Sequence, residues 1–203
     1  MANPRADQIV AAYPAAEPIA EQIVALSDRL GLADPAWLAN MVNFESGFDP
    51  AISNAGTGAT GLIQFMPATA TGLGTSTTAL RGMTAAQQWP FVERYLLKFA
   101  GKLRSSTDLY MAVFYPRAIG NPDYQFPEKV VRANNGIRTP RDYERMASAK
   151  ARLKFTARSE LRNAPASASL NRRSTAKATP WHWWAAGTAV IVGAVLLWRW
   201  RRA

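Results

Sequence analysis

The chain has 203 residues, of which 48% are hydrophobic and 19% charged, a size and composition that fit one globular domain with attachments and exclude a large multidomain protein. It has no cysteine, which excludes disulfide frameworks, thiol nucleophiles and cysteine-based metal sites. The net charge is +10; residues 1–145 hold 13 basic and 13 acidic side chains, so the excess lies entirely in residues 146–203. This last part therefore favours contact with anionic lipid, nucleic acid or wall polymer.

Two helices are predicted near the N-terminus. Apolar residues recur at helical spacing over about residues 17–30, and Gly31 follows as a helix-ending glycine. Asp34 and Pro35 then form a start signal for a second helix, which we expect to end near Gly47.

The segment that follows, residues 44–69, differs from a simple packing pattern. Glu45 lies in the last turn of the second predicted helix, next to Phe44 and close to Phe48. An apolar surface disfavours a charged carboxyl, and so does the C-terminal end of a helix dipole, so both raise the pKa. A carboxyl in this position can act as a general acid at neutral pH.

The remaining patterns of the N-terminal 155 residues are also helical. Residues 84–103 read as a helix with a break at Pro90, a short apolar helix is expected from Asp108 to Tyr115, and residues 139–142 carry a capping-box signal for one more. No strand pattern of comparable strength competes. The predicted fold class is mainly α.

The C-terminal part has a different character. Residues 156–180 read as a basic flexible linker, a solvated spacer that could also contact anionic lipid or DNA. Residues 183–198 carry no charge and have tryptophans at both ends, which is typical of a membrane span with interfacial anchors and is favoured over a buried core helix. The expected domains are 1–155, 156–180 as the linker, and 181–203 as a single transmembrane helix whose orientation is left open.

Neither a metal nor a cofactor is expected. The single histidine, His182, lies at the edge of the expected membrane span, and the glycines between Gly56 and Gly61 do not open a helix with the Lys-Ser/Thr pair of a phosphate loop. The N-terminus lacks the apolar run of a secretory signal, so export by an ordinary signal peptide is not expected.

Two short motifs carry a family resemblance. Glu45-Ser46 is followed by Gly-Phe-Asp-Pro and then by Gly61-Leu62-Ile63-Gln64, and together they resemble the catalytic domain of Slt-type lytic transglycosylases, which is related to goose-type lysozyme. The resemblance implies a lysozyme-like helical domain that cleaves the β-1,4 bond between N-acetylmuramic acid and N-acetylglucosamine in peptidoglycan. It implies Glu45 as the sole acid/base and a 1,6-anhydro product.

The same resemblance implies the substrate-binding residues. Ser46 would orient the Glu45 carboxyl or contact the sugar, and Phe65 would contact substrate beside Gln64. For Gln64 two roles stay open, since its amide could bind substrate or tether the loop.

The third family motif, Ala-Tyr-Asn-x-Gly, is where this chain departs from the pattern. Its counterpart by position is residues 112–116, and Phe114 stands where the tyrosine belongs. Catalysis then needs another hydroxyl, for which Tyr110 and Tyr115 are the candidates, and we expect both at the substrate site.

The expected protein is a membrane-anchored lytic transglycosylase acting on peptidoglycan glycan strands. The segments YMAVFYPRAIGNP and NNGIRTPRDYERM resemble those of phage virion-associated transglycosylases, so the expected location is a virion membrane or the host cell envelope, where the enzyme would open the wall locally during entry. Two alternatives remain: a non-catalytic peptidoglycan-binding or structural membrane protein of the virion, and a lysozyme-type hydrolase.

Overall fold

The structure is a computed structural model that describes residues 3–149. The expected linker and transmembrane segment lie outside the described residues. Residues 3–149 contain no β-strand, only isolated β-bridges from Thr60 to Ser53 and to Phe65. The mainly α prediction is therefore confirmed for these residues. The helices are α1 (Pro4–Ala12), η1 (Pro14–Ile19), α2 (Ala20–Leu30), α3 (Ala36–Ser46), α4 (Pro67–Gly72), α5 (Thr77–Arg81), α6 (Ala85–Leu96), η2 (Leu97–Phe99), α7 (Ser106–Phe114), η3 (Pro116–Ala118), α8 (Glu128–Ala133) and a helix over residues 140–149.

The two predicted N-terminal helices are present. The first begins as the 3-10 turn η1 and continues as α2 up to Gly31. α3 starts where predicted, because the Asp34 carboxylate accepts a hydrogen bond from the Ala36 amide at 2.7 Å. It ends at Gly47, whose φ of +63° is a left-handed conformation that glycine adopts without steric cost.

The break predicted at Pro90 was wrong. α6 runs through Pro90 without interruption, although proline cannot donate its backbone hydrogen bond. The helix is held on both sides of the proline. A capping box between Thr84 and Gln87 fixes its first turn, and the buried Trp89 and Val92 fix the rest against the core.

The two later helices also start at clear caps. α7 begins at Ser106, two residues before the predicted Asp108, because the Ser105 side chain accepts a hydrogen bond from the Asp108 amide. The capping box predicted over residues 139–142 is confirmed: the Asp142 carboxylate accepts from the amide and hydroxyl of Thr139, and the Thr139 hydroxyl accepts from the Asp142 amide.

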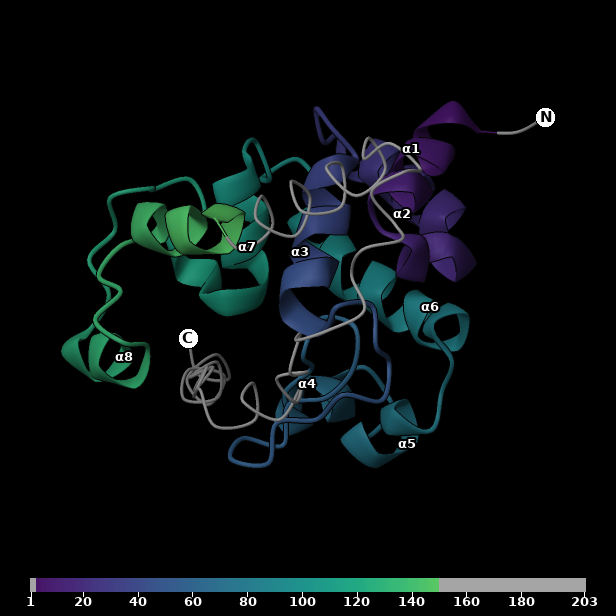
Figure 1. The fold of residues 1–203 in the computed structure, drawn as a ribbon. Coiled ribbons are helices and arrows are strands. Elements are labelled where there is room, and N and C mark those ends of the chain that lie inside the picture. The colour runs from purple at the N-terminus through teal and green to yellow at the C-terminus, as the bar shows by residue number, and fades with distance from the viewer. Residues whose placement is uncertain (1–2, 150–203) are drawn as a thin grey trace, which may run out of the picture.

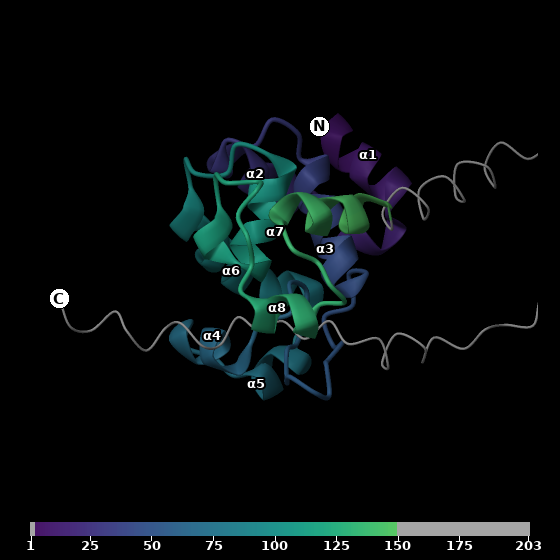
Figure 2. The same cartoon turned by 90° about the vertical axis from the view of Figure 1, so that its left-hand side faces the viewer.

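α3 lies in the middle of the fold (Figure 1), with α1 and α2 on one side and α7 and the 140–149 helix on the other. Turned by 90°, the view shows α4, α5 and α8 at the end of the molecule away from α1 (Figure 2). Leu38, Met41 and Val42 of α3 are fully buried, so this helix forms part of the core over most of its length. The residue that ends it, Ser46, is therefore held in a fixed place.

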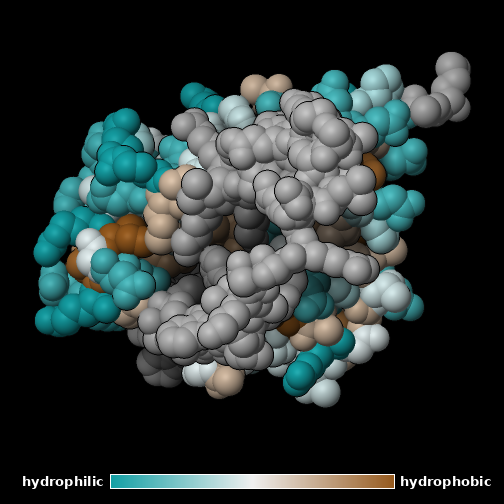
Figure 3. Space-filling view, viewed as in Figure 1, coloured by the Kyte–Doolittle hydropathy of each residue, from teal (hydrophilic) through white to brown (hydrophobic). Residues whose placement is uncertain are grey.

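The described surface is mostly hydrophilic where it is visible (Figure 3). Among residues 3–149, Ile52 is the one large hydrophobic side chain that is exposed. None of the helices in this range is long and apolar enough to cross a membrane.

Candidate active site

Glu45 lies in the last turn of α3; the residue as a whole is half-buried, while its carboxyl group is buried among aromatic side chains. Its neighbour Phe44 makes edge-on contacts with Tyr110, at 5.9 Å between ring centroids, and with Tyr143, at 5.8 Å. These contacts place the end of α3 against α7 and against the 140–149 helix. An aromatic wall therefore stands where the sequence predicted an apolar surface, but two of its rings come from distant segments.

Tyr143 provides the hydrogen bond to the Glu45 carboxyl. Its hydroxyl donates to Glu45 Oε1 over a long 3.4 Å, across a sequence separation of 98 residues. The Tyr143 ring is buried and stacks on Phe114 with 4.3 Å between centroids and 26° between planes. Phe114, which lacks the hydroxyl of the third family motif, thus supports the ring that supplies one.

Burial dominates the electrostatics of Glu45. It raises the pKa of Glu45 from its ordinary 4.5 to about 8, and the hydrogen bond from Tyr143 opposes this only in part. Burial and the charge of Glu45 also raise the pKa of Tyr95 to about 12 and raise the pKa values of Tyr110 and Tyr143. At neutral pH the carboxyl is therefore mostly protonated, with three neutral phenols around it.

Asp49, the nearest carboxylate in the sequence, belongs to a turn. It is exposed, and its side chain accepts a hydrogen bond from the Ala51 amide at 2.8 Å. Within residues 3–149, no other carboxylate contributes to the pKa shift of Glu45. The site has one buried carboxyl.

Ser46 braces the end of α3. Its hydroxyl lies 3.1 Å from the Val42 carbonyl and 3.0 Å from the Leu62 carbonyl, and accepts from the Phe48 amide at 3.1 Å. The side chain is buried. The structure therefore places Ser46 between α3 and the following loop, where it fixes the backbone on which Glu45 stands.

Gln88 of α6 holds both ends of that loop. Its side-chain Oε1 accepts from the Leu62 amide at 3.0 Å, and its Nε2 donates to the Pro50 carbonyl at 2.6 Å and to the Leu80 carbonyl at 2.7 Å. Gln88 is completely buried. It packs so closely on Gly61 that a Cβ there would lie 2.3 Å from Oε1. Gln88 was not predicted as a site residue, since nothing in the local sequence pattern distinguishes it from a surface amide.

Gln64 ties the loop to itself. Its Nε2 donates to the Gly61 carbonyl at 3.1 Å and lies 3.5 Å from the Ile52 carbonyl. Its φ of +52° is an unusual left-handed conformation for a residue other than glycine. Of the two roles left open, the structure shows the tether.

Phe65 lies in the core, with 2% of its surface exposed and an edge-on contact to Tyr95 at 6.2 Å. Its ring fixes the loop to α6. The contact of Phe65 with substrate stays a prediction.

The two tyrosines expected at the substrate site, Tyr110 and Tyr115, both lie in aromatic contacts, and their roles toward substrate stay predictions. Tyr110 is buried against Phe44 and Tyr143, while Tyr115 is buried against Tyr124 and Phe126. The hydrogen bond to Glu45 comes from Tyr143 instead. One signal pointed there: the capping box at 139–142 predicts the helix that carries Tyr143.

The comparisons with known proteins give one match. Residues 31–88 match a family model described as the transglycosylase SLT domain. The matched segment covers less than a third of the chain and includes Glu45, Ser46, Gln64 and Gln88, but not Tyr143. Neither the curated proteins nor the solved structures contain a match. The match supports a lytic transglycosylase of the lysozyme-like superfamily with peptidoglycan as substrate.

In residues 3–149, no group of three or more His, Asp or Glu side chains is arranged to hold a metal ion. The described site offers one carboxyl, the phenol that donates to it and the backbone groups of the loop.

Proposed function

We propose that this chain is a peptidoglycan lytic transglycosylase that cleaves the N-acetylmuramic acid to N-acetylglucosamine β-1,4 bond, with Glu45 as the acid and base. The observation that carries the proposal is the buried Glu45 carboxyl, with its pKa raised to about 8, inside the segment that matches the SLT domain model. A general acid needs a pKa near the working pH, and burial supplies it here.

In the first step the protonated Glu45 donates its proton to the glycosidic oxygen as the bond to C1 of the muramoyl residue breaks. The N-acetylglucosamine end leaves as an alcohol, and Glu45 is left as a carboxylate. The hydrogen bond from Tyr143 favours this charged form. In the second step the carboxylate takes the proton of the muramoyl 6-hydroxyl, whose oxygen bonds to C1. The 1,6-anhydro ring closes and Glu45 is protonated again.

The single carboxyl favours this route over hydrolysis by a carboxylate pair. Glycosidases of the usual type need a second carboxylate to activate water or to form a covalent intermediate. In the described part of the chain, Asp49 is bonded within its own turn, and no second carboxylate acts on Glu45. A nucleophile carried by the substrate itself, the 6-hydroxyl, needs no such partner.

Mass spectrometry of the products tests the proposal. The full-length chain and its Glu45→Gln variant are incubated with purified peptidoglycan. We expect muropeptides lighter by one water from the unsubstituted chain and none from the variant. Hydrated muropeptides would instead assign a lysozyme-type hydrolase. A chain that sediments with peptidoglycan but releases no product would be a binding protein.

We also propose a location: the chain is anchored by residues 181–203 in a membrane, either of a phage virion or of the host envelope. The support for this is the uncharged run over residues 183–198 with tryptophans at its ends and the likeness of two segments to virion-associated enzymes. An anchored enzyme would cleave the wall only within reach of its membrane.

A further inference from the structure

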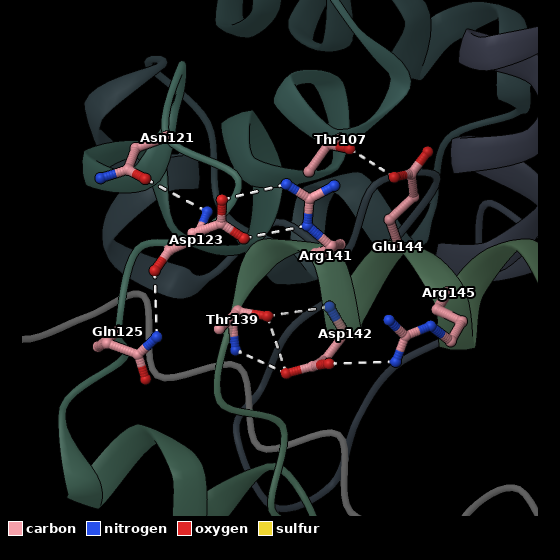
Figure 4. A network of polar contacts seen from close by, with 9 residues as sticks. All are labelled: Thr107, Asn121, Asp123, Gln125, Thr139, Arg141, Asp142, Glu144 and Arg145. Atoms are coloured by element: carbon pink, nitrogen blue, oxygen red, sulfur yellow. Dashed lines mark hydrogen bonds and ion pairs between the residues drawn. The ribbon is translucent and has the colours of Figure 1, made fainter.

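The 140–149 helix supplies the phenol of the site, so its position against α3 and α7 matters for Glu45. The chain reaches it from α7 through η3, an extended stretch and α8, which bury Ala118, Phe126 and Val130 in the core. Within the helix itself Tyr143 and Ala147 are buried, and polar side-chain interactions add to this packing in fixing where Tyr143 stands. Figure 4 shows these interactions: the ion pairs of Arg141 with Asp123 and of Arg145 with Asp142 form one group, and the contact of Glu144 with Thr107 belongs to the other.

The first group lies at the surface. Arg141 donates to both carboxylate oxygens of Asp123, at 3.0 and 3.1 Å, and Arg145 pairs with Asp142 at 3.3 Å. More than half of the Arg141 and Asp123 side chains is exposed. Ion pairs in this environment are screened by solvent and hold a helix weakly.

The second group joins the 140–149 helix to α7. The Glu144 carboxylate accepts a hydrogen bond from the hydroxyl of Ser106 and another from Thr107 Oγ1 at 2.5 Å. Both donors stand in the first turn of α7. Bonds to a charged acceptor are the stronger kind, and both Glu144 oxygens are used. Because α7 also carries Tyr110 and Phe114, which contact the Tyr143 ring, Glu144 and Tyr143 dock on the same helix.

We propose that Glu144 is the positioning residue of this site: its two hydrogen bonds to Ser106 and Thr107 lock the 140–149 helix onto α7 and so hold the Tyr143 hydroxyl toward Glu45. The proposal deepens the proposed function and rests on it for any effect on turnover. It gives Glu144 no contact with substrate.

The direction of the pKa change separates this role from a simple effect of charge. The groups facing Glu45 are Tyr95 of α6, Tyr110 of α7 and Tyr143. The hydrogen bond from Tyr143 lowers the Glu45 pKa, so losing it raises the pKa. Loss of the negative charge of Glu144 removes a Coulomb repulsion, and this effect alone would lower the pKa of Glu45. A rise after loss of Glu144 is therefore a signature of Tyr143 leaving its place.

The experiment compares Tyr143→Phe, Glu144→Ala and the double variant with the unsubstituted full-length chain. Two readouts are taken: the alkaline limb of the pH profile for anhydro-product formation, and the titration of the Glu45 carboxyl by 13C NMR, assigned with Glu45→Gln. We expect each single variant to raise both midpoints by about 0.5 to 1 pH unit, and the double variant to add nothing further.

Matched variants guard against a general loss of structure. Asp123→Asn breaks the surface anchor of the same helix with an equivalent loss of charge, and we expect unchanged midpoints. Glu144→Gln keeps an acceptor oxygen, so its midpoint shift should be at most half of the shift in Glu144→Ala. Thr107→Val removes one donor at constant volume and should show part of the Glu144→Ala shift. Circular dichroism checks that each variant is folded.

Three results would overturn the proposal: a Glu45 midpoint that is unchanged or lowered in Glu144→Ala, shifts of Tyr143→Phe and Glu144→Ala that add in the double variant, or an equal shift in Asp123→Asn. The NMR titration does not need turnover. A chain that makes no product but shows the predicted titration shifts would refute the proposed function and leave the positioning role intact.

Discussion

At the scale of single residues, Glu45 links stability to pH. Burial holds its folded pKa at about 8 against an ordinary value of 4.5, so the folded state binds this proton more tightly. The stabilisation is fully present below pH 4.5 and is lost as the pH rises through 8. Each unit of pKa difference amounts to about 1.4 kcal/mol of the free energy of unfolding.

We therefore expect Glu45→Gln, which keeps the shape without the titration, to gain stability relative to the unsubstituted chain between pH 5 and pH 9. Urea unfolding at the two pH values measures the change. The exposed Glu17→Gln serves as the control and should show no such gain. Equal stability differences at both pH values would mean that the Glu45 carboxyl titrates as in water.

Ser46 gives a second prediction at this scale. Ser46→Ala leaves the Leu62 carbonyl and the Phe48 amide without their buried partner, so it should lower the free energy of unfolding by about 1 to 3 kcal/mol. Thermal or urea unfolding measures this. Thr71→Ala, which removes an exposed hydroxyl bonded to the Pro67 carbonyl, is the control and should cost much less.

A rise in KM at unchanged stability in Ser46→Ala would contradict the bracing role. That result would instead support a role of Ser46 in contacting the sugar, which the family resemblance implies.

Candidate site residues could be predicted from the sequence where a motif or a helix end marks them locally. Glu45 is found from its place at a helix end and from the motif around it, and the tether of Gln64 was one of two open readings. Tyr143 could not be found in this way, because 98 residues separate it from Glu45 and only the folded contact between the two helices joins them. The core position of Phe65 was not predicted either, because a residue inside a motif can serve the core as well as the substrate.

At the scale of elements, helix ends with polar caps were predicted well. Asp34, Gly47 and Thr139 mark their helix ends through bonds or conformations within a few residues, which a sequence displays directly. Pro90 shows the opposite case. Its local preference against a helix is outweighed by the tertiary packing of Trp89 and Val92, which the sequence does not display.

The loop between α3 and α4 depends on a close fit of Gly61 against Gln88. Gly61→Ala would place a Cβ 2.3 Å from Gln88 Oε1 at a φ of +83°, so the substitution combines a steric clash with backbone strain. We expect a loss of about 2 to 4 kcal/mol in the free energy of unfolding together with a loss of activity. Unfolding curves and product yield measure the two effects.

Gly72→Ala is the matched control, because a Cβ at Gly72 meets no atom within 4 Å. It should leave stability unchanged or raise it slightly. Equal behaviour of the two alanine variants would show that the loop can shift away from Gln88 without cost.

At the scale of the whole molecule, a neutral part spans residues 1–145 and a part with net charge +10 follows it. A membrane anchor and a basic surface contact respond differently to salt, since screening weakens only the second. We expect the full-length chain to float with vesicles of anionic lipid at both low and high salt. A chain ending at residue 155 should stay at the bottom of the gradient at both salt concentrations.

Release of the full-length chain from the vesicles by high salt would show that the C-terminal part binds lipid by electrostatics only. Flotation of the shortened chain with the vesicles would place the lipid contact in the neutral part.

The mainly α class was predicted because helical spacing and caps recur along residues 3–149 without a competing strand pattern. The arrangement of the helices was not. It depends on buried contacts between segments far apart in the chain, such as that of Phe44 with Tyr143, and those have no local sign.

The meeting of Glu45 with Tyr143 also bears on how the molecule would fail when heated. The 140–149 helix buries Tyr143 and Ala147, whereas its ion pair with Asp123 is exposed to solvent. Proteins open in partial units well before they unfold globally. Detachment of this one helix would remove the phenol while the core around Leu38 and Met41 stayed folded. Catalytic competence would then be lost at a lower temperature than the helical circular dichroism signal, in molecules whose core is still folded.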